Sequence, residues 1–179
     1  MIEIVEAHTQ AQLQQCLQIR MQVFVYEQQV PAAEELDQFD LAQSTIHLLA
    51  SENGETLGTL RILPDVPGRV HIGRVAVSAR SRRKGVGSKL MQRAHEIVSK
   101  RFADDTGKIV IEISAQVQAI PFYQQLGYQI VNDETYLDAG IWHKIYLGAE
   151  KSAEKGTEKS DFAYPHLIFH LIFADSKPF

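Results

Sequence analysis

The segment from Arg82 to Ser88, with the sequence RRKGVGS, constrains this chain more than any other. It places three basic side chains directly before two glycines, Gly85 and Gly87. An apolar stretch at 70–77 precedes the segment, and residues 86–102 repeat apolar side chains at helical spacing. The sequence therefore predicts a strand, a basic glycine turn and an amphipathic helix in direct succession.

Such a turn is suited to bind a phosphate group. The first N–H groups of a helix have no partner within the helix, and the helix dipole is positive there. Glycine lets the backbone approach an anion closely, while Arg82, Arg83 and Lys84 add positive charge. The third glycine of a dinucleotide fingerprint and the Gly-Lys-Ser/Thr of a Walker loop are both missing. The turn predicts a diphosphate site, or else a solvated basic helix cap.

Charge is unevenly distributed along the chain. The net charge of -4 argues against a general nucleic-acid-binding protein, which carries a broad basic face. Basic residues concentrate in 80–93, whereas residues 27–40 contain five acidic side chains and no cation. This pattern favours a compact anionic ligand at the basic turn. The acidic stretch either binds a cationic ligand or is a solvated face.

Cysteine and apolar segments indicate the compartment. Cys16 is the only cysteine, so an intramolecular disulfide is impossible. The longest apolar stretch, 167–174, is too short to span a bilayer, which requires about 20 residues. We therefore expect a cytoplasmic protein without a membrane partner. With a single cysteine the chain has no paired-cysteine ligand set, and we expect no metal.

Hydrophobic periodicity predicts one α/β domain over residues 1–148. Thr9 and Gln12 form a capping box before a helix whose apolar stripe is Leu13, Leu17, Met21 and Phe24. Asn53-Gly54 predicts a hairpin turn. The expected strands are 2–7, 46–51, 56–63, 70–77, 109–114, 128–131 and 142–147, and the later helices are 86–102 and 117–126.

The C-terminal part differs in composition. Residues 149–160 are rich in Glu and Lys and predict a polar linker, and 161–179 form an apolar tail. An apolar segment beyond a polar linker is expected to dock on its own sheet or on a partner subunit. The second arrangement would give a homodimer.

Two motifs together resemble the GNAT (Gcn5-related N-acetyltransferase) superfamily. The first is Val75-Ala76-Val77 followed by Arg82-x-x-Gly85-x-Gly87. The second is Gln116-x-x-Ala119-x-x-Phe122-Tyr123-x-x-x-Gly127-Tyr128. Segments 19–40, 72–77 and 138–143 are similar to the ElaA/YjcF-type branch of that superfamily. One departure is Arg83, which stands where the family usually has glycine.

The resemblance implies a mixed, mostly antiparallel twisted sheet of about six to seven strands, with flanking helices and a splayed central strand pair. Acetyl-CoA would lie in the splay, with pantetheine along the strand and the pyrophosphate on the basic turn. The residues implied in cofactor binding are Val75, Ala76, Val77, Arg82, Arg83, Lys84, Gly85, Val86, Gly87, Ser88, Gln116, Ala119, Phe122 and Tyr123.

Acetyl transfer to an amine needs a proton donor for the leaving thiolate and a base for the amine. By resemblance Tyr123 is the proton donor. Alternatively, Tyr123 only packs in the core. His71, placed by strand alternation on the same face as Gly73 and Val75, is one candidate base. Its alternative is a structural hydrogen bond. Glu27 is a second candidate base, and Glu27, Glu35, Asp37 and His143 are the candidate acceptor-binding residues.

These features predict an N-acetyltransferase that moves an acetyl group from acetyl-CoA to a primary amine by direct attack in a ternary complex. The acceptor would be a small-molecule amine or a protein amine. A catalytically silent acyl-CoA-binding sensor or regulatory module is the alternative, because the phosphate turn alone does not distinguish an enzyme from a sensor.

Overall fold

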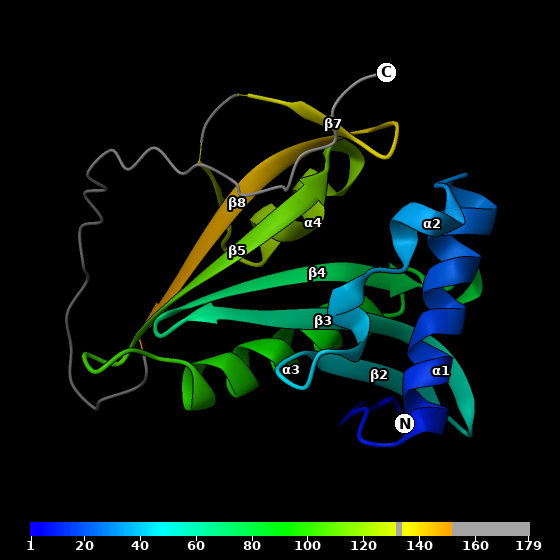
Figure 1. Ribbon diagram of the computed structural model, residues 1–179, viewed down its shortest axis with the longest axis horizontal. Coiled ribbons are helices and arrows are strands. Elements are labelled where there is room, and N and C mark those ends of the chain that lie inside the picture. The colour runs from blue at the N-terminus through cyan, green and yellow to red at the C-terminus, as the bar shows by residue number, and fades with distance from the viewer. Residues whose placement is uncertain (132–133, 152–179) are drawn as a thin grey trace.

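The computed structural model describes residues 1–131 and 134–151, which form one mixed sheet covered by helices (Figure 1). The strand order is β1-β2-β3-β4-β5-β8-β6, and β7 also pairs with β8. All described strand pairs are antiparallel except β4–β5. The strands are β1 (Glu3–Glu6), β2 (Ile46–Glu52), β3 (Glu55–Val66), β4 (Arg69–Val77), β5 (Lys108–Gln116), β6 (Gln129–Ile130), β7 (Tyr136–Asp138) and β8 (Ile141–Lys151).

This sheet confirms the predicted fold class. The described part has eight strands because the short β7 adds one to the seven expected from periodicity. The Asn53-Gly54 turn joins β2 to β3 with both residues at positive φ, 51° and 80°. Strand β8 extends to Lys151, three residues beyond the domain end expected at 148. The rest of the predicted linker and the apolar tail lie outside the described residues.

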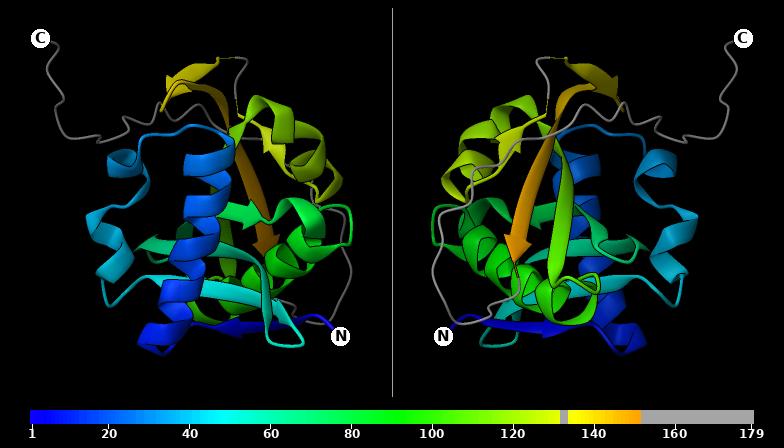
Figure 2. Two further views of the ribbon diagram at one scale, coloured as in Figure 1. Left: turned by 90° about the vertical axis from the view of Figure 1, so that its right-hand side faces the viewer. Right: turned by 90° about the vertical axis from the view of Figure 1, so that its left-hand side faces the viewer.

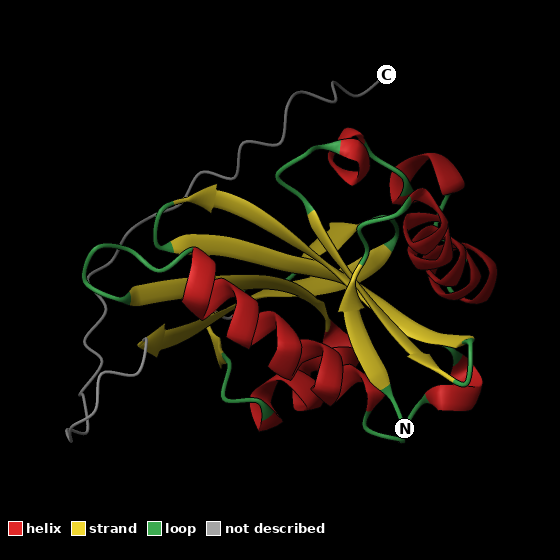
Figure 3. Cartoon of the chain, turned by 90° about the horizontal axis from the view of Figure 1, so that it is seen from below, coloured by secondary structure: helices red, strands yellow, loops and turns green. Residues whose placement is uncertain are grey.

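The helices cover both faces of the sheet (Figures 2 and 3). Helix α1 and helix α3 pack on opposite faces of β2, β3 and β4. The capping box of Thr9 and Gln12 begins α1, as predicted. No helix in the described ranges is long and apolar enough to cross a membrane. The helices are α1 (Gln10–Arg20), which continues as a π-helix (Met21–Glu27), α2 (Ala32–Glu35), α3 (Val86–Arg101) and α4 (Ile120–Gln125).

The central strands β4 and β5 diverge, as Figure 1 shows. They pair only where Arg69–His71 of β4 lies beside 110–112 of β5. Beyond His71, the edge of β4 that faces β5 has no strand partner within the described residues. The predicted splayed strand pair is therefore confirmed. Its carboxyl end, where the strands are farthest apart, is the end from which the 78–85 loop leads into α3.

The buried stripe of α1 differs from the prediction. Leu13, Leu17, Met21 and Phe24 are only half-buried. The fully buried positions of the helix are Cys16, Ile19, Arg20 and Val23. The apolar pattern misplaced the stripe because the side chain of Arg20, normally an exposed residue type, is 0% exposed here.

Arg20 belongs to a closed ring of six alternating charges. Its guanidinium contacts Glu35 and Asp40, each at 2.5 Å. Arg61 on β3 contacts Asp40 and Asp37, each at 2.7 Å. Arg74 on β4 completes the ring. It lies 3.3 Å from Glu35 and 3.5 Å from Asp37. The ring ties the acidic 31–41 segment to α1, β3 and β4, so a buried arginine is kept with matched partners.

The ring also fixes the ionisation of Asp40. Burial alone would raise the pKa of this carboxyl, but the hydrogen bonds and charge of Arg20, with help from Arg61, lower it to about 2. The ordinary value is 3.8, and the difference corresponds to about 2 kcal/mol. Because the folded-state pKa lies below the unfolded one, this stabilisation is complete above about pH 5 and is lost as the pH falls through about 2.

We expect Asp40→Asn to destabilise the protein most near neutral pH. The difference in unfolding free energy between wild type and variant should shrink by about 1–2 kcal/mol between pH 5 and pH 2.5. Urea unfolding at the two pH values measures it. Glu3→Gln, at an exposed carboxylate on β1, is the matched control and should show no such change. A pH-independent difference for Asp40→Asn would contradict this description of the ring.

Candidate functional site

The basic turn leads directly into α3. Arg83 and Gly85 both adopt left-handed backbone conformations, with φ of 64° and 79°. Gly85 is the N-cap residue, and no side chain among the described residues caps this helix end. A Cβ added to Gly85 would meet no described atom within 4 Å, so the turn opens onto free space. The arrangement leaves the first N–H groups of α3 available to an anion.

A bulge in β4 turns two of its side chains to the other face. Gly73 lies opposite Arg61 of β3, whereas Val77 lies opposite Gly58. Positions 61 and 58 are an odd number apart, so Gly73 and Val77 face opposite sides of the sheet. The extra residue is taken up at Arg74, whose φ is 52°.

The bulge corrects one prediction. His71 shares the face of Gly73 but not that of Val75, because simple alternation along β4 fails at Arg74. Val75 and Val77 instead pack against the core on the α3 face. His71 faces the opposite side, with its Nδ1 3.9 Å from an oxygen of Glu112.

Arg74 connects the bulge to the charge ring. A non-glycine residue with positive φ is strained, and the surrounding contacts must hold it. The guanidinium of Arg74 makes these contacts with Glu35 and Asp37 and also donates to the backbone carbonyl of Glu34. The acidic segment predicted to bind an acceptor thus also fixes the bulged strand. Nothing in the sequence indicates this role beyond an arginine that follows Gly73.

A cleft of about 780 Å³ opens where β4 and β5 diverge. One wall is β4 and the basic turn, and the other is the end of β5 with α4. The π-helix after α1 and the β7–β8 turn close its ends. Predicted cofactor residues that line the cleft are Val75, Val77, Arg82, Arg83, Gly85, Val86, Gly87, Ser88, Gln116, Ala119, Phe122 and Tyr123.

Two predicted cofactor residues do not line the cleft. Ala76 is 1% exposed and pairs with Thr59, on the face that packs under α1. Lys84 is exposed on the basic turn. Ala76 and Lys84 therefore belong to the motif in sequence but, unlike its other residues, do not line the cleft.

Two side-chain bridges join the π-helix to both walls of the cleft. Glu27 forms an ion pair with Arg82, whose Nε also donates to the Val77 carbonyl at 3.1 Å. Gln28 and Gln116 exchange amide hydrogen bonds of 2.7 and 3.2 Å. Gln28 was not among the predicted site residues. It is the C-cap residue of the π-helix and directly follows Glu27, so two adjacent residues contact opposite walls.

The predicted acidic residues occupy different positions. Glu35 lines the cleft but is 2% exposed and bound by Arg20 and Arg74. Asp37 is bound by Arg61 and Arg74, and it does not line the cleft. Glu27, bound to Arg82, does not line it either. Each of these carboxylates forms an ion pair with at least one arginine.

The two histidines named in the sequence analysis are placed differently. His71 does not line the cleft, and burial with the positive charges of Arg61 and Arg74 lowers its pKa to about 4. His143, on β8, does line the cleft and lies opposite Gln116 of β5. Its Nδ1 lies 2.9 Å from the carbonyl oxygen of Ile141, and the ring of Tyr136 stacks on it at 5.8 Å.

Tyr123 is placed by α4. Its side chain is 6% exposed, lines the cleft and contacts the rings of Phe122 and Tyr128. Burial raises the pKa of its phenol well above the ordinary value of 10. The phenol therefore stays protonated and is a proton or hydrogen-bond donor rather than a base.

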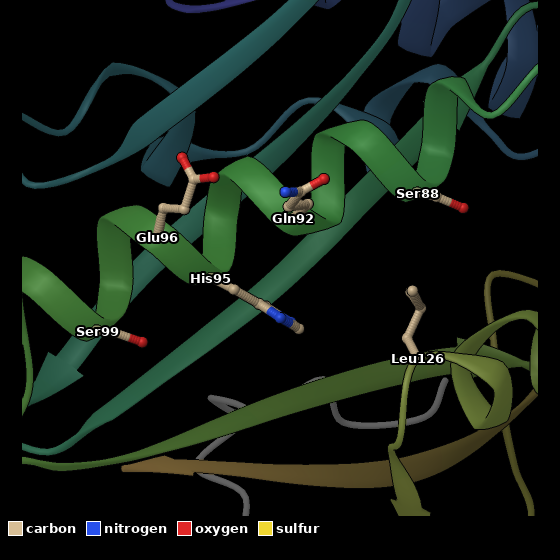
Figure 4. A pocket seen from close by; sticks show the side chains of 6 residues that line it. All are labelled: Ser88, Gln92, His95, Glu96, Ser99 and Leu126. Atoms are coloured by element: carbon tan, nitrogen blue, oxygen red, sulfur yellow. The ribbon is translucent and has the colours of Figure 1, made fainter. Parts of the chain in front are cut away.

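A second hollow lies along α3 (Figure 4). Ser88, His95 and Ser99 extend from one side of the helix, and Leu126 lies across from them after α4. The Nε2 of His95 lies 2.6 Å from the hydroxyl of Tyr128. Among the described residues, no group of three or more His, Cys, Asp or Glu side chains is arranged to hold a metal ion.

The split sheet, the basic turn at a helix start and the cleft between them are typical of acyltransferases that use coenzyme A thioesters. Residues 5–146 match the family model described as "Acetyltransferase (GNAT) domain". The chain therefore belongs to the GNAT acetyltransferase family.

Three relatives agree with this assignment. The Bacillus subtilis protein named "Uncharacterized N-acetyltransferase YjcF" is 33% identical over 143 residues, covering 79% of this chain and 96% of that protein. The crystal structure of Escherichia coli ElaA gives a TM-score of 0.71 at 31% identity, covering 84% of this chain and 100% of that chain. The crystal structure of an acyl-CoA N-acyltransferase from Pseudomonas aeruginosa gives a TM-score of 0.69 at 34% identity, covering 82% of this chain and 97% of that chain. The resemblance to the ElaA/YjcF-type branch is confirmed.

Because Arg74 has a positive φ, we expect glycine to be more stable than alanine at this position, the reverse of the usual order in a strand. Glycine is normally less stable than alanine within a strand, but at a φ of 52° alanine carries the left-handed penalty. Both variants lose the same ion pairs. We therefore expect Arg74→Gly to be more stable than Arg74→Ala by about 1 kcal/mol in urea unfolding.

Arg93, which forms an exposed pair with Glu96 on α3, provides the control. There the usual order should hold, with Arg93→Ala more stable than Arg93→Gly. An alanine variant at position 74 as stable as the glycine variant would show that the bulge is not strained.

Proposed function

We propose that this protein transfers an acetyl group from acetyl-CoA to a primary amine, by direct attack within a ternary complex. The observation that carries the proposal is the cleft between β4 and β5, which joins an uncapped helix start at one end to a buried phenol and a histidine. Membership of the GNAT family supports acetyl transfer in general.

The donor half of the cleft fits an acyl-CoA. The N–H groups at the start of α3, with Arg82 and Arg83, would bind the pyrophosphate. The free edge of β4 around Val75 would hydrogen-bond pantetheine, since the strand lacks a described partner there. A backbone N–H on this edge would also polarise the thioester carbonyl, where negative charge develops.

The chemistry requires a donor for the departing sulfur. Tyr123 is suited to this role because its buried phenol keeps its proton and lines the cleft beside Ala119 and Phe122. Direct attack needs no covalent enzyme intermediate. Cys16, the only cysteine, lies on the buried face of α1 and is 0% exposed, so it is not an available nucleophile.

The proposal is tested by incubating the protein with acetyl-CoA and a panel of primary amines while thiol release is followed. We expect acetylation of at least one amine. Tyr123→Phe should lower kcat by about 100-fold while its affinity for coenzyme A changes less than twofold. Tyr26→Phe, at a tyrosine that is 71% exposed, is the control. Tight binding of coenzyme A with no turnover on any amine would instead favour a sensor.

The phosphate turn is tested by comparing two glycines. Gly85 and Gly54 have nearly the same φ, 79° and 80°, and neither has an atom near its missing Cβ. Valine at either position costs the same backbone strain, but only the Gly85 side chain would enter the phosphate site. We expect Gly85→Val to weaken coenzyme A binding at least 50-fold, about 2 kcal/mol, in calorimetry. Gly54→Val should bind normally, and equal affinities would disprove the assignment of the turn.

A further inference from the structure

The proposed acetyl transfer leaves the base unassigned, and we propose that His143 is the general base that deprotonates the acceptor amine. This inference rests on the proposed function. The two bases predicted from sequence, His71 and Glu27, do not line the cleft, whereas His143 does. The assignment follows from the placement, the tautomer and the support of its ring.

Placement brings His143 to the acceptor side of the cleft. It pairs with Gln116 across β5 and β8, and Gln116 immediately precedes the segment that leads to Tyr123. The turn at Ala139 and Gly140, with φ of 48° and 77°, reverses the chain and returns β8 along this wall. A base on β8 and a proton donor on α4 therefore border the same cavity.

The hydrogen bond of the ring defines its tautomer. A carbonyl oxygen can only accept, so Nδ1 must donate its proton to the Ile141 carbonyl at 2.9 Å. In the neutral imidazole the proton is then on Nδ1, and Nε2 carries the lone pair. The described residues provide no hydrogen-bond partner for Nε2. This nitrogen is available to take a proton from a bound amine.

The ring is also held in one plane. Tyr136 stacks on it with an angle of 28° between the rings, and the imidazole is 9% exposed. A fixed, correctly protonated imidazole is the arrangement in which a histidine base is effective. The competing groups lack these properties, since Glu27 is paired with Arg82 and the pKa of His71 is lowered to about 4.

Two protons leave the ammonium during the proposed step. Nε2 of His143 takes a proton from the bound ammonium and passes it to solvent, which frees the nitrogen lone pair. The nitrogen bonds to the carbonyl carbon, the C–S bond breaks, and the sulfur leaves with the bonding electrons and takes a proton from Tyr123. The second amine proton passes through His143 and restores the Tyr123 phenol. An ammonium and a thioester thus give an amide, a thiol and one proton.

The test uses His143→Asn, because the asparagine amide can still donate to the Ile141 carbonyl but cannot act as a base. His143→Gln is measured in parallel, as a second variant. Coenzyme A affinity, measured by calorimetry, reports the folded cleft without any chemistry. His8→Gln, an exposed histidine before α1, is the matched control. The acceptors are the alkylamine that wild type acetylates best and the alkoxyamine of the same chain length.

We expect His143→Asn to bind coenzyme A within about twofold of wild type and to lose about 100-fold or more in kcat/KM with the alkylamine. The loss should be at least tenfold smaller with the alkoxyamine, which is already unprotonated at pH 7. A merely structural role would lower both rates equally, and that result would overturn the inference. So would full activity of both variants, or a loss found only in His71→Gln or Glu27→Gln.

Failure of the proposed function and failure of the His143 assignment give different results. Wild-type protein that acetylates no amine would overturn the proposed function and this inference with it. Wild-type turnover that is undiminished in the coenzyme-A-binding His143 variants would overturn the assignment of His143 alone.

Discussion

The alternating charge ring around the buried Arg20 is the interaction on which the arrangement of the cleft depends. Removing any one member takes away one of the two partners of each neighbouring charge in the ring, which is destabilising where the remaining charge is buried. The ring spans α1, the acidic 31–41 segment, β3 and β4. One of its arginines, Arg74, lies in the β4 bulge. The ion pairs that bind the acidic segment to α1 therefore also hold the strand that borders the cleft.

The bulge and the splay act together. The bulge turns Val75 and Val77 toward the α3 face, and the splay leaves the adjoining edge of β4 without a described strand partner. Backbone polar groups at such an edge need partners, which an extended ligand provides. The bridges from Glu27 to Arg82 and from Gln28 to Gln116 tie the π-helix to both walls. A ligand entering the cleft therefore meets groups positioned by β4, the basic turn, β5 and the end of the π-helix.

Much of the donor side could be predicted from sequence because its chemistry is local. The glycines, the basic run and the following helix lie within a few residues of one another, and Asn53-Gly54 fixes its hairpin alone. The β4 bulge could not be predicted, because apolar alternation before and after Arg74 gives no sign of an inserted residue. The burial of Arg20 could not be predicted for a related reason. Its carboxylate partners lie 15 and 20 residues away, so nothing local indicates its burial.

The acceptor side was harder to predict than the donor side, since the roles of its histidines and acids depend on long-range contacts.

Amide hydrogen exchange with and without acetyl-CoA tests most directly whether the split sheet is the binding site. We expect slower exchange in residues 74–88 and 116–123, with no change in 92–99 along the second hollow of α3. Protection confined to 92–99, or absent from β4, would contradict the account.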